Sequence, residues 1–249
     1  MKKILVFLII ALLVFSFFSS QTTFNIGLIG ATPTIRRVPD DYPTIQAAIN
    51  EASEDDIISV GLGVYFEHVV VNKTVKLIGD NKETTIIDGN GTGPVVQVTA
   101  PDVGVSGFTV QNASGIGLLS SGVVVRATTG SEITANIIKA NWIGVYLDSS
   151  RGNTVTDNIV IGNTYGIYLS QAGRNTFDHN TVLDNRWGFV ISVAGSSGNV
   201  LRNNSMSRNS QNFKLFTAYI ALSDFDQDID FSNTVDGKPI CYWVNQRDR

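Results

Sequence analysis

The chain has 249 residues, of which 43% are hydrophobic and 16% are charged, and its formal net charge is −4. This acidic balance argues against nucleic acid as a partner, because a surface that binds nucleic acid has to neutralise phosphates with lysine and arginine. The single cysteine, Cys241, excludes an internal disulfide. The length fits one or two globular domains, or one domain of stacked repeats.

Residues 1–31 are predicted to form a signal peptide or an N-terminal anchor. The basic end Met1–Lys3 precedes the apolar run Ile4–Phe18, which is the order of a secretory signal. A second apolar stretch, Phe24–Ala31, makes the segment long enough for an uncleaved membrane anchor instead. Both alternatives predict an extracytoplasmic protein (secreted, periplasmic or on the cell surface) that meets a membrane only through this segment, and only if it is uncleaved.

A linker and a capping helix are predicted next. Residues 32–43 contain three prolines and are expected to lead into a single β-helix domain over residues 44–249. Thr44 is a favourable N-cap residue. Four apolar residues then recur at helical spacing: Ile45, Ala48, Ile49 and Ala52. We expect a short amphipathic helix that covers the first coil of a repeat structure, because an open solenoid end exposes apolar surface and strand edges.

Short apolar runs separated by glycine, asparagine and aspartate follow from residue 56 onward. Their length and composition are typical of strands. The predicted strands are Ile57–Val60, His68–Val71, Val75–Ile78, Thr85–Ile87, Val95–Val98, Val103–Val105, Phe108–Val110 and Val123–Arg126.

From residue 131 onward, asparagine recurs with a period of 22 or 24 residues. The columns are Asn136, Asn158, Asn180 and Asn204; Asn141, Asn163, Asn185 and Asn209; and Asn153, Asn175 and Asn199, beside a glycine column of Gly144, Gly166 and Gly188. Runs too short for helices at this period predict an all-β fold, a right-handed, single-stranded parallel β-helix with three short strands per coil of about 22 residues. No leucine ladder or helical segment recurs, which argues against a leucine-rich repeat.

Apolar residues in the same register predict the interior of the β-helix. The expected inward columns are Ile133, Val155, Phe177 and Leu201; Val145, Ile167 and Phe189; and Leu147, Leu169 and Ile191. Neighbouring members would lie about 4.8 Å apart. The asparagines are expected at the turns, because asparagine tolerates left-handed backbone and stacked amides can bond from coil to coil. We therefore interpret the asparagine columns as scaffold.

The C-terminal stretch is expected to hold further strands. Aspartates alternate with other residues over 224–230, which predicts a strand with one polar face; the run lacks the glycine and distal glutamate of a calcium-binding loop. A turn over Ser232–Lys238 and an apolar strand over Pro239–Val244 are expected next. No cap is recognisable, so we expect the coil to continue beyond Arg249 or to be covered by another chain.

Several motifs resemble known right-handed β-helix proteins. Thr44-Ile45-Gln46-Ala47-Ala48-Ile49-Asn50, Gly63-Val64-Tyr65-Phe66-Glu67 and Val70-Val71-Asn72-Lys73 are similar to the opening of pectin esterases and pectate-lyase-like folds. The asparagine-rich coils, and the end Ser232–Ile240, resemble the NosD-like repeats of that superfamily more specifically. The resemblance covers about Val38 to Arg249. It implies an exported β-helix and, since NosD-type proteins are associated with copper maturation of nitrous oxide reductase, a periplasmic copper-handling accessory protein.

The residues themselves give little support to a copper site. Copper is held by histidine, cysteine and methionine, and residues 32–249 contain four of these: His68, His179, Met206 and Cys241. His68 is distant in sequence, and His179 and Met206 fall in different columns. The sequence therefore predicts no metal site and no cofactor.

Four polar residues on neighbouring coils are candidates for catalysis on a polysaccharide. Asp157 and His179 fall in one column, and Asp178 and Arg202 fall in another, so each pair would lie one coil apart. Such pairs suit ligand binding or acid–base chemistry, and glycoside hydrolysis uses two carboxyl groups. The later motifs of the pectin esterases are not found downstream, and a solvated repeat face explains the same residues without catalysis.

Aromatic residues offer a site for sugar binding without chemistry. Tyr146 and Tyr168 alternate with the inward columns, so they should point outward one coil apart, and Trp142 and Trp187 lie near the same turns. These four are expected either to form an aromatic strip for sugar faces or to cover the coil edges.

We interpret the chain as an exported, non-catalytic binding or scaffold module of the NosD-like type, with a polysaccharide or cell-surface glycan as its partner. One alternative is a carbohydrate-active enzyme, a hydrolase or lyase that uses the outward aspartate and histidine residues. The other alternative is a periplasmic copper-handling protein.

Overall fold

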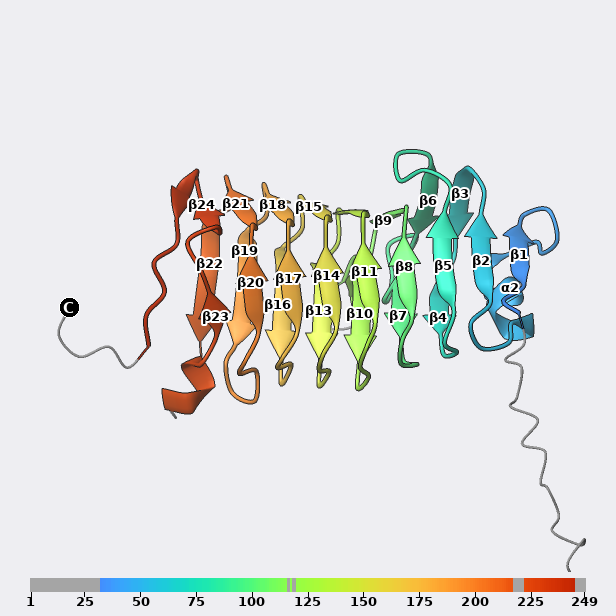
Figure 1. The fold of residues 1–249 in the computed structure, drawn as a ribbon. Helices are drawn as coiled ribbons and strands as arrows, with labels where there is room; N and C mark the ends of the chain where they lie inside the picture. Colours follow the sequence, from blue (N-terminus) through green and yellow to red (C-terminus); the bar gives the residue numbers. More distant parts are fainter. Residues whose placement is uncertain (1–31, 116, 118–119, 217–221, 245–249) are drawn as a thin grey trace, which may run out of the picture. The chain divides into compact units, whose positions relative to one another are not determined.

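Successive coils of the chain build three β-sheets that run side by side along the molecule (Figure 1). The computed structural model describes residues 32–115, 117, 120–216 and 222–244. The described helices and strands belong to one compact unit that begins at Pro33. The predicted signal peptide or anchor, residues 1–31, lies outside the described residues. None of the helices within the described ranges is long and apolar enough to cross a bilayer.

From β2 to β24, each sheet collects every third strand of the chain. Sheet A holds β1 (Ile35–Val38), β2 (Ile57–Val60), β5 (Lys76–Gly79), β8 (Gly104–Ser106), β11 (Glu132–Thr134), β14 (Thr154–Thr156), β17 (Thr176–Asp178), β20 (Val200–Arg202) and β23 (Asp228–Ile229). Sheet B holds β3 (Gly63–Phe66), β6 (Thr85–Asp88), β9 (Thr109–Gln111), β12 (Ile137–Lys139), β15 (Ile159–Ile161), β18 (Thr181–Leu183), β21 (Ser205–Ser207), β24 (Thr234–Val235) and β25 (Lys238–Pro239). Sheet C holds β4 (Val69–Val71), β7 (Val96–Val98), β10 (Ser121–Arg126), β13 (Ile143–Asp148), β16 (Tyr165–Ser170), β19 (Trp187–Ser192) and β22 (Gln211–Phe216).

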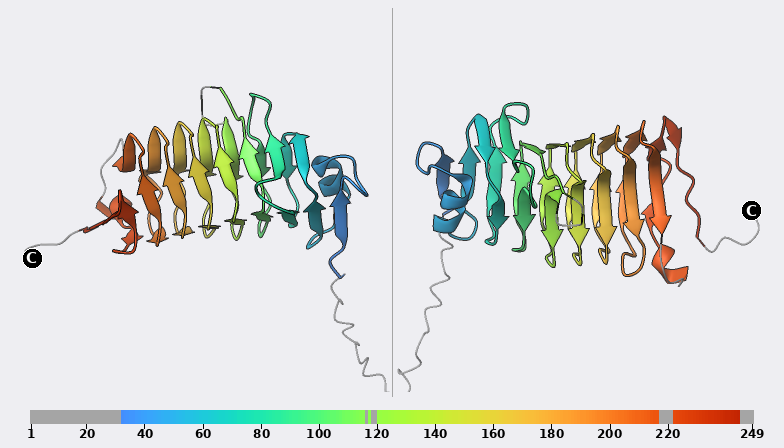
Figure 2. Two further views of the ribbon diagram at one scale, coloured as in Figure 1. Left: turned by 90° about the horizontal axis from the view of Figure 1, so that it is seen from above. Right: turned by 180° about the vertical axis from the view of Figure 1, so that it is seen from behind.

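Strands one coil apart pair in parallel, as two further views of the stack illustrate (Figure 2). The antiparallel pair β24–β25 is the exception. Val155 pairs with Phe177 and Phe177 with Leu201, and all three are fully buried. The other two inward columns are equally buried. The predicted parallel β-helix with three short strands per coil is confirmed, and so are its inward columns.

The first coil uses a helix where later coils use strands. β1 pairs with β2, so the stretch predicted as a linker supplies the first strand of sheet A. Helix α2 (Ile45–Glu51) follows, and the hydroxyl of Thr44 accepts a hydrogen bond from Ala47 N at 3.0 Å, which confirms the predicted N-cap. Ile45, Ala48 and Ile49 are fully buried. The predicted capping helix is therefore present.

The motif residues that resemble the opening of other β-helices hold this cap in place. The Glu67 carboxylate accepts hydrogen bonds from the backbone of Ile45 and Gln46, both at 3.0 Å. The Gln46 side chain accepts from Val70 N at 2.7 Å and donates to Val70 O at 3.3 Å, so it satisfies the edge of β4. Lys73 Nζ donates to the helix-end carbonyls of Asn50 and Ala52. These residues are explained by scaffold alone, because each satisfies an exposed helix end or strand edge.

The asparagine columns form hydrogen-bonded ladders along the stack. In the first column, both the backbone N–H and the side-chain amide of Asn136 donate to Asn158 Oδ1, at 3.1 Å each. Asn158 donates in the same way to Asn180 Oδ1, at 3.2 and 3.1 Å. Its side chain also donates to Ile133 O at 2.7 Å. The predicted coil-to-coil amide bonding is confirmed, and it satisfies backbone groups that the turns would otherwise bury unpaired.

The left-handed backbone lies one residue before the asparagines rather than at them. Ala135, Asp157, His179 and Asn203 precede the first column and have φ values of 55, 55, 53 and 53°. The asparagine itself turns its amide inward to the ladder, so the preceding residue makes the turn and points its side chain away. The expectation that the asparagines adopt this conformation is wrong.

Glycine is required in the column Gly144, Gly166 and Gly188 by close packing between coils. A Cβ at Gly166 would lie 2.5 Å from Gly188 O and 2.8 Å from a methyl group of Val182. Neither the backbone carbonyl nor the packed core can move away cheaply.

The C-terminal coils are less regular than predicted. Residues of the expected polar strand form a short 3₁₀ helix, η1 (Leu222–Phe225), before the two-residue strand β23. Within the predicted strand Pro239–Val244, only Pro239 belongs to a strand. That prediction is wrong beyond Pro239; the segment instead returns over the last coil, where Ile240 N donates to Asn233 O.

Candidate functional site

The outward face of sheet C carries a band of aromatic side chains. Tyr146, Tyr168, Val190 and Lys214 stand in register on β13, β16, β19 and β22. Tyr165 and Trp187 form a second column beside them. The band alternates with the core because residues on either side of each outward position, such as Ile167 and Leu169, point inward and are fully buried.

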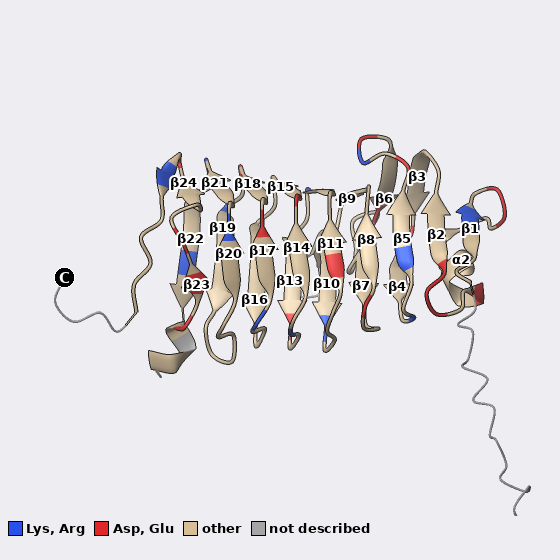
Figure 3. Cartoon of the chain, in the orientation of Figure 1, with Lys and Arg blue, Asp and Glu red and all other residues tan. Residues whose placement is uncertain are grey.

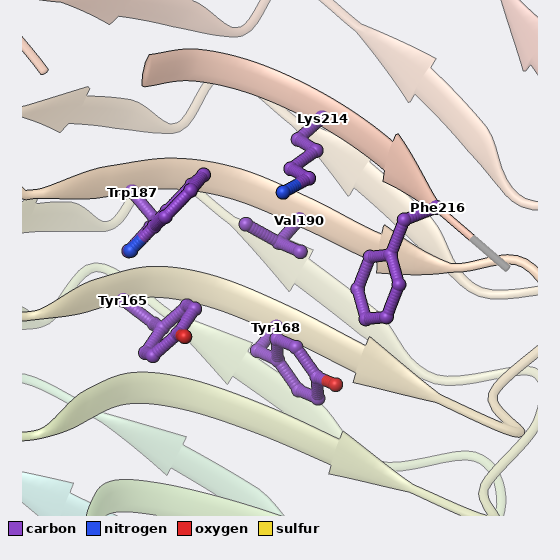
Figure 4. Close-up of a pocket in the computed structure, with 6 residues that line it drawn as sticks. All are labelled: Tyr165, Tyr168, Trp187, Val190, Lys214 and Phe216. Carbon is purple, nitrogen blue, oxygen red and sulfur yellow. The ribbon is translucent and has the colours of Figure 1, made fainter. Parts of the chain in front are cut away.

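Five of these outward residues, together with Phe216, line an open hollow of about 220 Å³. They are Tyr165, Tyr168, Trp187, Val190, Lys214 and Phe216 (Figure 4). The volume is smaller than the roughly 300–1,000 Å³ of a typical small-molecule pocket. A hollow of this size on an open sheet suits one ring of a chain that extends over the surface.

The rings around the hollow present both faces and edges. Tyr165 and Trp187 stack with their centroids 6.0 Å apart and their planes 10° apart. Tyr168 packs edge-on to Tyr165 at 5.6 Å and lies 6.3 Å from Phe216. The ammonium group of Lys214 lies 4.3 Å from the centre of the Trp187 ring and 5.7 Å from that of Phe216. Burial, followed by the neighbouring Tyr165, raises the pKa of Tyr168.

Tyr146 belongs to this band but is buried, and it does not line the hollow. Its side chain is only 2% exposed, and it packs with Val124 and Ile143 in a second apolar cluster outside the core. It also contacts Tyr168, with centroids 5.6 Å apart. Burial and the nearby Asp148 raise the pKa of Tyr146 to about 12, despite a hydrogen bond with Ser170. Tyr146 and Tyr168 both point outward from the core, as predicted. Tyr168 lines the hollow, whereas Tyr146 packs against Tyr168 without lining it.

Trp142 belongs to a different hollow from Trp187. It lines a smaller depression with Ser114, Gly115 and Thr164, and it meets Tyr165 edge-on at 6.3 Å. Of the four aromatic candidates from the sequence, Tyr168 and Trp187 therefore share the hollow, while Tyr146 and Trp142 pack behind and beside it.

Sequence reasoning missed Tyr165, Val190, Lys214 and Phe216. Tyr165 precedes Gly166 as Trp187 precedes Gly188, so the glycine column was the available signal for this pair. Lys214 and Phe216 would have required extending the repeat to residues 211–216, where the asparagine and glycine columns end. Val190 carries no chemical signal, because it continues an aromatic column with an ordinary apolar residue.

The polar candidates lie on a different edge of the coil, at the turn from sheet A to sheet B. His179 Nδ1 lies 2.9 Å from Asp178 Oδ1, which also accepts a hydrogen bond from Asn203 Nδ2 at 2.9 Å. Burial alone would raise the pKa of Asp178, but the bonds from Asn203 and His179 outweigh it and the pKa is lowered. The structure therefore pairs Asp178 with the histidine of its own coil.

The pairs expected across coils are not formed. Arg202 stands beside Asp178 in the sheet register but bonds to Asp228 Oδ2 at 2.6 Å and lies 3.3 Å from Asp230 Oδ2. The acidic run 224–230 thus supplies the carboxylates that pair with Arg202, a role that the repeat pattern had assigned to Asp178. Asp157 is exposed, and its carboxylate has one hydrogen bond among those described, from the hydroxyl of Thr156 at 3.4 Å. The left-handed turn directs Asp157 and His179 to solvent, and no hydrogen bond or ion pair joins their side chains among the described residues.

The four residues that could ligate copper lie apart. His68 contacts Pro94 O at 2.9 Å and the Thr92 hydroxyl at 3.0 Å, which fixes its ring against the loop before β7. Met206 is fully buried in the core, and Cys241 is exposed beyond β25. The described residues contain no group of three or more His, Cys, Asp or Glu placed to hold a metal ion.

Charged side chains do not gather into a patch of one sign in the view of Figure 3. Lysine, arginine, aspartate and glutamate lie mostly at the turns, and about half of the described strands contain none. The aromatic hollow, in contrast, brings chemically related side chains together on the outward face of sheet C.

Comparisons with known proteins place this geometry in context. A family model described as "Periplasmic copper-binding protein (NosD)" matches residues 46–221. No curated protein matches the sequence. Among solved structures, the pectin methylesterase from Yersinia enterocolitica is 15% identical, with a TM-score of 0.58 over 80% of this chain and 92% of that one. The carrot pectin methylesterase is 16% identical, with a TM-score of 0.59 over 84% of each chain.

A third solved structure has the same fold in a longer protein. The catalytic domain of an alpha-1,3-glucanase in complex with tetrasaccharides is 12% identical, with a TM-score of 0.59 over 78% of this chain and 38% of that one. At these identities the likeness shows a shared β-helix.

Proposed function

The chain belongs to the NosD family, and we propose that it is an extracytoplasmic, non-catalytic β-helix module that binds carbohydrate on the outward face of sheet C. The observation that carries the proposal is the parallel pair Tyr165 and Trp187 at the edge of an open hollow. A sugar ring has one face of C–H groups, and a flat aromatic ring buries such a face without requiring matched hydrogen bonds. The rigid sheet fixes both rings before a ligand arrives, which reduces the entropy that binding has to overcome.

The solved structures support carbohydrate as the ligand class. Two of them are named as pectin methylesterases, and the glucanase domain was solved with tetrasaccharides bound. The periplasmic description of the family supports a place outside the cytoplasm.

Two observations favour binding over catalysis. A glycosidase needs a general acid whose pKa is raised. The aspartates with a shifted pKa among the described residues are Asp56, Asp178, Asp184 and Asp230, and in each the pKa is lowered. The aromatic hollow is also lined by no carboxylate.

The family description implies copper, but the residues present do not fit a copper site. Copper needs several His, Cys or Met side chains around one point. Met206 is buried among core residues, and the rings of His68 and His179 face different partners on different coils. We therefore assign no role to copper.

A carbohydrate-active enzyme is the second candidate, and the contact between Asp178 and His179 favours it. The two side chains are partly exposed and 2.9 Å apart, which suits proton transfer to or from a bound sugar. Formation of new reducing ends from a polysaccharide would support this candidate.

The proposal is tested by retention of the purified protein on immobilised neutral and acidic oligosaccharides. We expect retention on at least one glycan. We expect Trp187→Ala to weaken this retention at least about tenfold, since stacking of a nucleic-acid base on one aromatic side chain contributes on the order of 1–3 kcal/mol. Trp243→Ala is the matched control, because Trp243 is 65% exposed and does not line the hollow. Absence of retention on every glycan, or equal retention of the Trp187→Ala protein, would overturn the proposal.

A further inference from the structure

We propose that the hollow on sheet C selects anionic glycans, with the ammonium group of Lys214 binding a carboxylate or sulfate of the sugar that lies against Trp187 and Tyr165 in the hollow. This inference rests on the proposed function and specifies its ligand. It follows from the position, the partners and the surroundings of Lys214.

Lys214 occupies a position that is uncharged in every earlier coil of its column. Val124, Tyr146, Tyr168 and Val190 precede it in the sheet register. The outward column therefore places a positive charge at one side of the hollow, next to the aromatic pair (Figure 4). A sugar ring that enters the hollow beside Trp187 would present its substituents to Lys214, because the ammonium lies 4.3 Å from the centre of the Trp187 ring.

The charge of Lys214 is not matched within the described part of the chain. The long strands of sheet C, β10, β13, β16, β19 and β22, carry three charged residues: Arg126, Asp148 and Lys214. Arg126 Nε and Asp148 Oδ2 pair at 2.8 Å. No ion pair to Lys214 occurs among the described residues, where its ammonium meets the faces of Trp187 and Phe216 instead.

These surroundings make an anion a favourable partner. The ammonium is partly removed from water by aromatic rings, which raises the strength of its interaction with an opposite charge. The ring faces attract the cation but leave its N–H donors without strong acceptors. A carboxylate or sulfate would accept a charge-assisted hydrogen bond there, while its sugar ring stays on the aromatic pair.

The test compares two probes with the same sugar chain, one of which carries carboxylates and the other neutral methyl esters. Affinities are measured for a hexamer of galacturonic acid and for the same hexamer fully methyl-esterified, by titration calorimetry at low and at moderate salt. A sulfated oligosaccharide of neutral sugars forms a third arm and distinguishes sulfate from carboxylate as the preferred anion.

We expect the wild-type protein to bind at least one anionic probe about tenfold or more tightly than the neutral hexamer, as one charge-assisted hydrogen bond allows. Lys214→Gln should remove the preference and Lys214→Arg should retain it. The preference should also weaken as salt rises, because the hollow is open to solvent.

The variants separate failure of this inference from failure of the proposed function. Equal affinity for charged and neutral probes, or a preference that survives Lys214→Gln, would overturn anion selection while leaving glycan binding intact if Trp187→Ala still weakens both. Binding of none of the three probes would overturn anion selection, and together with absence of retention on every immobilised glycan, or with retention that Trp187→Ala leaves unchanged, it would overturn both. Circular dichroism of each variant establishes that a lost affinity does not reflect an unfolded protein.

Discussion

The asparagine ladders and the outward face of sheet C are built from the same coils but follow opposite rules. In the first ladder the same residue returns in each coil, at Asn136, Asn158, Asn180 and Asn204, and each is at most 1% exposed. On the outward face the residue changes from coil to coil, from Ile143 to Tyr165, Trp187 and Gln211 in one column. A buried turn requires the same residue type in each coil, whereas an outward position can hold a residue that contacts a ligand.

The difference shows where function can be sought in a repeat protein. A residue that repeats is explained by the contact it makes with its own copy in the next coil. A residue that breaks its column, as Lys214 does after Val190, has no such explanation and points to a ligand or a partner.

Replacing a ladder asparagine should have the largest effect on stability. Asn158→Ala removes the acceptor for both donors of Asn136 and leaves them buried. We expect the free energy of unfolding to fall by about 3 kcal/mol or more, since each unpaired buried donor costs about 1–3 kcal/mol. Chemical denaturation measures the change, with Asn72→Ala as an exposed control. A loss no larger than in the control would mean that the ladder is not a source of stability.

Replacing a glycine of the column should have the second-largest effect on stability. In Gly166→Ala the new Cβ would lie 2.5 Å from a backbone carbonyl, and we expect a loss of about 1–3 kcal/mol from overpacking. Gly162→Ala is the control for space, because no atom lies within 4 Å of its Cβ, and its loss should be the smaller one: its φ of 67° strains alanine, but alanine already stands at the matching turn position 140 with φ of 55°. Thermal unfolding of the two variants compares them. Equal melting temperatures would show that the coils can separate to admit a methyl group.

The sequence was sufficient for the ladder, the core columns and the cap, because each depends on a residue type that recurs or on a local spacing. It was insufficient for the site in two ways. Tyr165 and Trp187 were separable from scaffold aromatics only once the hollow beside them was known. The partners of Asp178 and Arg202 depended on the irregular acidic segment, whose fold no repeat predicts.

The stability of the protein should fall at alkaline pH because of the buried tyrosine of the aromatic band. The raised pKa of Tyr146, about 12 against an ordinary value of 10, means that its neutral form stabilises the fold. This contribution is complete below about pH 10 and is lost as the pH rises toward 12. We expect Tyr146→Phe to be less sensitive over this range in urea denaturation at pH 9 and 11. The same alkaline loss in both proteins would contradict burial of this hydroxyl.

The turn residue Asp157 should have the smallest effect. Its exposed side chain contributes one long hydrogen bond, so Asp157→Ala is expected to change stability by less than about 0.5 kcal/mol. Chemical denaturation of Asp157→Ala and Asn158→Ala compares the free energies of unfolding for two adjacent residues, one exposed and one buried. A large loss in Asp157→Ala would show that the turn column is structural, contrary to the division drawn above.

The most direct test of a ligand site on sheet C, away from the polar turns, compares Trp187→Ala with the double variant Asp157→Ala and His179→Ala. Both are incubated with the same glycans as the wild-type protein, and retention and new reducing ends are measured together. We predict that retention falls at least about tenfold in Trp187→Ala and is unchanged in the double variant, and that no new reducing ends form. New reducing ends that disappear in the double variant, with retention unaffected by Trp187→Ala, would contradict it and place the function on the polar turns.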